Sequence, residues 1–168
     1  VKYNDTVTIG IVNDVNNLDP QGSNTDANMM VFYLTHERLV NIDPDTNKVI
    51  PALAKSWTVS ADGCVYDFTL CDGVTFTDGT PLTAEDVKYT YDKAKTSSFA
   101  SQKGADVVST EAIDDTHVRV TLAKANQDWL TLMAHGGMSI MSKAACEADP
   151  VNGPRMGSGM FSLKEWVP

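Results

Sequence analysis

Three things are scarce in this sequence of 168 residues: long apolar runs, basic residues and cysteines. Apolar stretches such as Met29 to Leu34 are far shorter than the ~20 residues that a membrane-spanning helix needs. Thirteen Lys and Arg against 22 Asp and Glu give a net charge of −9. Because a phosphate backbone is bound through a surplus of basic side chains, we expect neither a nucleic acid nor an anionic membrane surface as a partner.

The three cysteines, Cys64, Cys71 and Cys146, are too few for a disulfide framework, and an odd number cannot all be paired within the chain. Cys64 and Cys71 stand at the two ends of one predicted strand, where seven steps of ~3.3 Å would separate their Cα atoms by roughly 23 Å. A disulfide tolerates a separation of about 7 Å. We therefore expect no bond between these two residues, and three free thiols. The sequence contains no CxxC, no HExxH and no histidine cluster, so we expect neither a bound metal nor a cofactor.

The rest of the composition, with 42% hydrophobic and 21% charged residues, is typical of a globular protein. Alternating β-branched residues predict a first strand over Thr6–Val12. A loop rich in Asn, Asp, Pro and Gly follows, and Thr25 or Asp26 can then cap a helix from about Ala27 to Glu37. A short strand over Leu39–Ile42 precedes a polar turn.

Two later segments have the alternation and the turn residues of β-hairpins. The first pairs Trp57–Ser60 with Cys64–Leu70, and the second pairs Val107–Ile113 with His117–Leu122. This mixture of helices and antiparallel hairpins predicts a mixed α/β fold. The remaining predicted elements are helices that begin at Thr83, at about Asn126 and after Ser142, and short strands over Met138–Met141 and Met160–Lys164.

One ordered series of motifs runs through essentially the whole chain. Its strongest part is PALAKSW at 51–57 with VSADG at 59–63, which continues to DGV at 72–74 and DGTPLTAEDV at 78–87. In this series, and in NLDP at 17–20 and GSG at 157–159, the chain resembles the extracellular solute-binding proteins of family 5, which serve peptide, dipeptide and nickel ABC importers. Cys71 and Met160 depart from the family pattern, but both lie in structural segments.

The resemblance implies a mixed α/β fold, namely the first-lobe portion of a two-lobed periplasmic-binding-protein-like fold with a hairpin-rich subdomain. Residues 1–42 would begin lobe I, residues 43–149 would form an inserted subdomain, and residues 150–168 would return to lobe I. Because family members are several times longer, we expect this chain to be an N-terminal fragment that lacks the second lobe. The block from 51 to 87 is expected to be scaffold, because Asp-Gly turns and a helix cap account for it.

The resemblance also implies a function without catalytic residues. The protein would be the extracytoplasmic substrate-binding component of an ABC importer, monomeric, and either periplasmic or lipid-anchored at the outer face of the cell membrane. It would capture oligopeptides or dipeptides by closure of two lobes and deliver them to a membrane permease. The alternatives are a nickel chelate or a sugar as the ligand, a hydrolase, and a surface-adhesin domain. A hydrolase needs a nucleophile–base pair, which no spacing in the sequence reveals.

Ligand contacts in this family lie on the loops of the cleft, so the resemblance implies two binding segments, 23–28 and 136–139. Asp26 either holds the amine of a peptide or merely caps its helix. Asn17 and Phe161 are weaker candidates. The full set of expected ligand-binding residues is Asn17, Ser23, Asn24, Thr25, Asp26, Asn28, Gly136, Gly137, Met138, Ser139 and Phe161.

Two local patterns resemble sites of other kinds but lack essential residues. Residues 43–47 begin like a calcium-binding loop, yet Lys48 and Ala54 stand where Gly and Glu are needed, so a polar turn is expected there. Residues 135–137 resemble the oxyanion-hole HGG of esterases, but the sequence contains no GxSxG nucleophile motif. We therefore expect a turn at this position and no metal ligand at His135.

Overall fold

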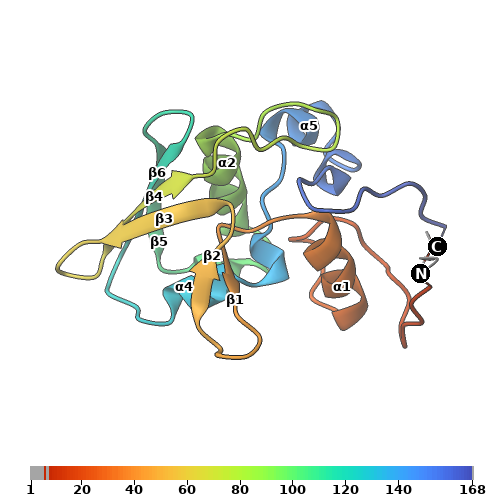
Figure 1. Cartoon of the computed structure of the whole chain (residues 1–168), viewed down its shortest axis with the longest axis horizontal. Coiled ribbons are helices and arrows are strands. Elements are labelled where there is room, and N and C mark those ends of the chain that lie inside the picture. The colour runs from red at the N-terminus through yellow and green to blue at the C-terminus, as the bar shows by residue number, and fades with distance from the viewer. Residues whose placement is uncertain (1–5, 7, 168) are drawn as a thin grey trace, which may run out of the picture.

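The computed structural model describes residue 6 and residues 8–167 of the chain. The larger of its two sheets is antiparallel, with four strands in the order β3-β4-β6-β5 (Figure 1). The strands are β3 (Ala54–Val59), β4 (Val65–Leu70), β5 (Val107–Ala112) and β6 (His117–Leu122). Both predicted hairpins are therefore confirmed, and β4 joins them by pairing with β6.

One face of this sheet forms the core with helix α2 (Ala84–Ala94) and helix α4 (Trp129–Met133). Tyr66 and Phe68 point toward this core because they alternate with the more exposed residues of β4. Trp129 is fully buried, with its ring centroid 4.6 Å from that of Tyr66 and 6.4 Å from that of Tyr91 on α2. The short helix α4 thus supplies the largest side chain of the core.

Asp86 fixes the start of α2 and joins it to helix α5 (Lys143–Ala148). One carboxylate oxygen of Asp86 accepts a hydrogen bond from the backbone N–H of Thr83 at 2.9 Å, and the other accepts from that of Lys143 at 2.9 Å. Ser142 caps α5, because its side chain accepts from the N–H of Ala145. The helix starts predicted at Thr83 and Ser142 are both confirmed.

Helix α1 (Asp26–Thr35) and the two ends of the described chain lie on one side of the molecule, and the four-stranded sheet lies on the other (Figure 1). The hairpin of β1 (Val40–Ile42) and β2 (Val49–Pro51) stands between them. The boundary predicted at residue 43 falls within this hairpin. The remaining elements are α3 (Ser101–Gly104) and the 3₁₀ turns η1 (Gly136–Met138) and η2 (Gly153–Arg155).

The strands predicted at the two ends of the chain are not formed. Residues 6 and 8–12 are irregular, and Val7 lies outside the described residues. Residues 160–164 are also irregular, because their segment bonds to the end of a helix and not to a strand: the N–H of Phe161 donates to the carbonyl of Leu34 at 3.2 Å. A β-strand needs a neighbouring strand to pair with, and alternation alone does not provide one.

The strand predicted over Met138–Met141 is wrong as well. Its first residue ends the 3₁₀ turn η1, and the segment then runs through the core with Ile140 fully buried. The backbone N–H of Ile140 donates to the carbonyl of Glu37, and that of Met141 donates to the hydroxyl of Thr90. A side chain and a loop carbonyl satisfy this backbone in place of a neighbouring strand.

The expectation of free thiols is met in the described part of the chain. All three cysteines are free, including Cys64 and Cys71 at the two ends of β4. None of the helices in the described part is long and apolar enough to cross a membrane.

Candidate functional site

The loop before α1 is shaped by two asparagines that turn inward. The side chain of Asn17 donates to the carbonyl of Gly22 at 3.2 Å and accepts from the N–H of Asp19 at 2.7 Å. Asn28 is fully buried, and its side chain donates to the carbonyl of Asn17 and accepts from the hydroxyl of Thr25 at 2.9 Å. Both asparagines, predicted as ligand contacts, therefore serve as internal braces of the loop.

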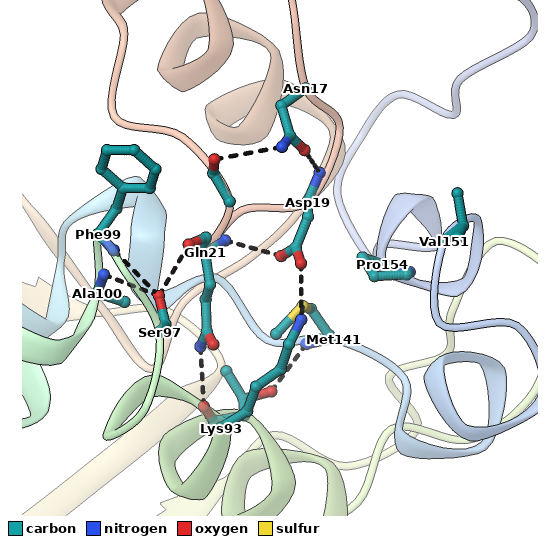
Figure 2. Close-up of polar contacts among 12 residues, drawn as sticks. Asn17, Asp19, Gln21, Lys93, Ser97, Phe99, Ala100, Met141, Val151 and Pro154 are labelled. Atoms are coloured by element: carbon teal, nitrogen blue, oxygen red, sulfur yellow. Dashed lines mark hydrogen bonds and ion pairs between the residues drawn. The ribbon is translucent and has the colours of Figure 1, made fainter.

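The same loop is fastened to α2 by a network that Figure 2 shows. The side chain of Gln21, 2% exposed, donates to the carbonyl of Thr90 at 2.9 Å. The hydroxyl of Ser97 donates to the carbonyl of Gln21 at 2.8 Å, and Lys93 forms an ion pair with Asp19 at 2.8 Å. The loop and the turn after α2 are thus held side by side although they are about seventy residues apart.

Only some of the predicted ligand-binding residues at the start of α1 are exposed. Thr25 is the N-cap, and its hydroxyl accepts from the N–H of Asn28 at 3.4 Å. Asp26, one residue further along, is exposed and has no part in the cap. Asn24 is exposed too, whereas Ser23 is buried. Of the two capping residues that the sequence left open, Thr25 is the one used, so the carboxylate of Asp26 faces solvent.

The second predicted segment, η1, packs against both α1 and the loop. The backbone N–H of Gly136 donates to the hydroxyl of Tyr33 on α1 at 3.3 Å. A Cβ atom on Gly136 would lie 2.7 Å from the sulfur of Met29, so the side chain of Met29 would have to move if another residue stood here. A Cβ atom on Gly137 would lie 3.5 Å from the carbonyl oxygen of Pro20. Structure therefore brings together two segments that the sequence separates by more than a hundred residues.

The side chains of η1 and of the residue after it are buried and cannot contact a ligand. Gly136, Gly137, Met138 and Ser139 are all buried. The ring nitrogen Nδ1 of His135 accepts from the N–H of Gly137 at 3.0 Å, so the His-Gly-Gly motif caps its own turn. The turn predicted at this position is confirmed.

Helix α3 and the turn before it add cationic and aromatic side chains that the sequence did not single out. Burial lowers the pKa of His135, and the nearby charges of Lys103 and Arg38 lower it further. Phe99, on the turn that Ser97 anchors, is 42% exposed. We call residues 17–25, 97–103 and 135–139 together the three-loop surface. No local pattern identifies it, because its members meet only in the tertiary structure.

Phe161 lies elsewhere. It is 56% exposed and its backbone bonds to Leu34, near the end of α1, whereas Thr25 caps the start of that helix. The ten residues of α1 separate these two points by about 15 Å. The structure does not bring Phe161 to the three-loop surface.

His36 joins the end of α1 to η2. The ring is 2% exposed, with Nδ1 2.8 Å from the hydroxyl of Thr35 and Nε2 3.0 Å from the carbonyl oxygen of Pro154. Since a carbonyl only accepts, Nε2 carries the proton. Burial lowers the pKa of His36 to about 4.

We expect this histidine to make the chain acid-sensitive. In the unfolded chain a histidine binds a proton below about pH 6.5, whereas folded His36 stays neutral down to about pH 4. Its contribution is therefore complete above pH 6.5 and decreases as the pH falls from 6.5 to 4, by up to roughly 3 kcal/mol. Urea unfolding at both ends of this range should show a smaller loss of stability for His36→Gln than for the wild type. An equal loss in both proteins would contradict the assignment.

Residues 43–47 form the predicted polar turn. One carboxylate oxygen of Asp43 accepts from the N–H groups of Thr46 at 2.8 Å and Asp45 at 3.0 Å. These bonds, that of Thr46 first, lower the pKa of Asp43. In the described part of the chain, no three or more His, Cys, Asp or Glu side chains gather in a way that could hold a metal ion.

Comparison with known proteins relates this fold to one family. The profile described as bacterial extracellular solute-binding proteins, family 5 Middle, matches residues 48–168. The probable D,D-dipeptide-binding periplasmic protein DdpA of Escherichia coli K12 is 32% identical over 96% of this chain and 34% of its own length. The glutathione-binding protein GsiB of the same strain is 29% identical over 95% of this chain and 32% of its own length.

A solved structure agrees. NikZ from Campylobacter jejuni, in complex with Ni(L-His), superposes with a TM-score of 0.80 at 26% identity, over 92% of this chain and 32% of NikZ. The chain thus spans about a third of the length of each of these proteins. Its mixed α/β fold is that of the matching part of a periplasmic binding protein. The chain belongs to the family 5 bacterial extracellular solute-binding proteins.

Proposed function

We propose that this chain belongs to the extracytoplasmic substrate-binding component of an ABC importer, which captures oligopeptides or dipeptides and delivers them to a membrane permease. The observation that carries the proposal is the three-loop surface, where braced loops leave Asn24 and Phe99 exposed, and the exposed Asp26 follows directly after its first loop. DdpA is named for binding D,D-dipeptides and GsiB for binding glutathione, both peptide compounds. The role requires binding and release, without catalysis.

The chemistry of this surface suits a short peptide. A carboxylate at an exposed position, such as that of Asp26, forms charge-assisted hydrogen bonds with an ammonium group. Lys103 and His135 lie together on the three-loop surface and suit the other, carboxylate end of a peptide. We propose that the protein acts as a monomer, in the periplasm or anchored by lipid at the outer face of the membrane.

The lobe arrangement is part of the same proposal. Residues 1–42 and 150–168 would belong to lobe I, and residues 43–149 to its inserted subdomain. One contact supports the first grouping: the indole N–H of Trp166 donates to the carbonyl of Val15 at 3.1 Å, so the two terminal segments lie together. A ligand would be enclosed when a second lobe closes over the three-loop surface.

A nickel chelate is the second candidate ligand, because NikZ was solved with Ni(L-His). Mass spectrometry of the protein purified from its source organism without added ligand separates the two. A co-purified peptide supports the proposal, a nickel chelate supports the second candidate, and a ligand of another chemistry contradicts both.

Asp26 provides the sharper test of peptide capture. We expect the wild type to bind a dipeptide with a free amine better than the N-acetylated dipeptide, and Asp26→Asn to lose this preference, on the order of tenfold or more in Kd. Calorimetry at high protein concentration measures both peptides. Asp115→Asn, an exposed carboxylate on the turn before β6, is the matched control and should keep the preference. A preference that survives in Asp26→Asn would exclude this carboxylate as the amine site.

A further inference from the structure

Arg38 is a buried cation that has no carboxylate partner in the described part of the chain. The residue is 8% exposed and lies just before β1. Its Nε atom donates to the side-chain oxygen of Asn41 at 3.0 Å, and Nη2 donates to that same oxygen. The third nitrogen, Nη1, is buried and finds no hydrogen-bond acceptor among the residues that the structure describes. One neutral oxygen thus serves a group that can donate five hydrogen bonds.

This arrangement is unusual for a protein of net charge −9. Among the described residues, no carboxylate lies within the 4.0 Å that defines an ion pair with Arg38. Burial lowers the pKa of Arg38, and the charge of neighbouring Glu37 opposes this only in part. Buried charges are ordinarily paired, because an unpaired one loses its hydration without compensation.

The guanidinium group borders a groove of about 400 Å³ between α1, the β1–β2 hairpin and the end of α4. The ring of Tyr33 lies over it, with the guanidinium carbon 4.7 Å from the ring centroid. Tyr33 also accepts from the N–H of Gly136, so the groove adjoins the three-loop surface. The residues that line the groove are Tyr33, Arg38, Asn41, Ile42, Ile50 and Ala134.

We propose that this groove is a subsite for a carboxylate carried by a compact, partly apolar solute. A carboxylate would supply the two acceptors that match the fork of Arg38, where Asn41 now supplies one. Ile42 and Ile50 would contact the carbon chain of the solute. The subsite deepens the proposed function, on which it rests for the source of the carboxylate.

Entry of a carboxylate requires a local movement, because Nη1 has no exposed surface. Tyr33 is the side chain that can make it. Its ring is stacked on the guanidinium and is 46% exposed, so it can turn outward without leaving a cavity in the core. The hydrogen bond that its hydroxyl accepts from the N–H of Gly136 would be exchanged for one with water.

The test is an NMR titration of the ¹⁵N-labelled chain that follows the Nε–H signal of Arg38. The probes are N-acetyl-leucine, which has the carboxylate, and N-acetyl-leucinamide, which lacks it. We expect the acid to shift this signal in a saturable way and the amide to leave it unchanged. Arg38→Met should weaken binding of the acid on the order of tenfold. Arg119→Met, which removes an exposed arginine paired with Asp67, should leave binding unchanged.

Equal responses to acid and amide would overturn the proposal, and so would an unshifted Arg38 signal at the solubility limit of the acid. The titration of the wild type decides the matter even if Arg38→Met does not fold. A chain that shows the amine preference due to Asp26 but no response at Arg38 would retain the proposed function and lose this subsite. A response at Arg38 without any peptide binding would retain the subsite and contradict the proposed function.

Discussion

Gly157→Ala is expected to destabilise the chain by roughly 3 kcal/mol or more. A Cβ atom at this position would lie 2.0 Å from the carbonyl oxygen of Thr35 and 2.8 Å from the ring of His36. Neither neighbour can move aside, because Thr35 ends α1 and His36 is bonded on both sides of its ring. The backbone around Gly157 must shift instead, and the bond from the N–H of Thr77 to its carbonyl, at 3.0 Å, would be lost with it.

Urea unfolding followed by circular dichroism measures this loss, with Gly73→Ala as the matched control. Gly73 has a left-handed backbone with φ of +71°, but nothing lies within 4 Å of the position of a Cβ atom. Alanine there introduces only backbone strain, of about 1 kcal/mol. If Gly157→Ala were no more destabilising than Gly73→Ala, the close approach to α1 would be refuted.

Trp129→Ala should cost about 3 to 5 kcal/mol of stability. The side chain is fully buried and reaches three aromatic rings from two other elements, those of Tyr66, Phe68 and Tyr91. Its indole N–H has no acceptor in the described structure, so the loss comes from packing and the cavity that remains. Since domains of this size are stable by only about 5 to 15 kcal/mol, the variant should be close to unfolding at ambient temperature.

Trp57→Ala offers the comparison for this variant. Trp57 contacts the same cluster from β3, with its ring centroid 6.3 Å from that of Phe68, but it is only partly buried. Its replacement should therefore cost clearly less than that of Trp129, as measured by the urea midpoint of each variant. Equal costs would mean that α4 does not form the centre of the core.

Proposals about the ligand depend on contacts that span the sequence. The exposure of Asp26 follows from the capping by Thr25, and the position of the loop follows from Gln21 and Thr90. A variant of Gln21 would thus disturb the whole three-loop surface, whereas Asp26→Asn changes one charge at its edge. This difference makes Asp26 the better probe of binding.

The sequence alone determined the elements whose cause is local. Alternating residues and tight turns predicted the β3–β4 and β5–β6 hairpins, because a strand that folds back on its neighbour carries its own partner. The helix starts at Thr83 and Ser142 were also predictable, since a cap needs only residues within the first turn. The free state of Cys64 and Cys71 followed from the length of the strand between them.

Only the tertiary structure decided the rest. The two terminal segments predicted as strands are irregular at residues 6, 8–12 and 160–164 and find no partner strand in the described structure, and pairing is a property of two segments. The three-loop surface and the Arg38 groove likewise depend on bonds such as that from Gln21 to Thr90, 69 residues away. Local patterns carry no information about such partners, because burial and hydrogen bonding are settled only when distant segments pack together.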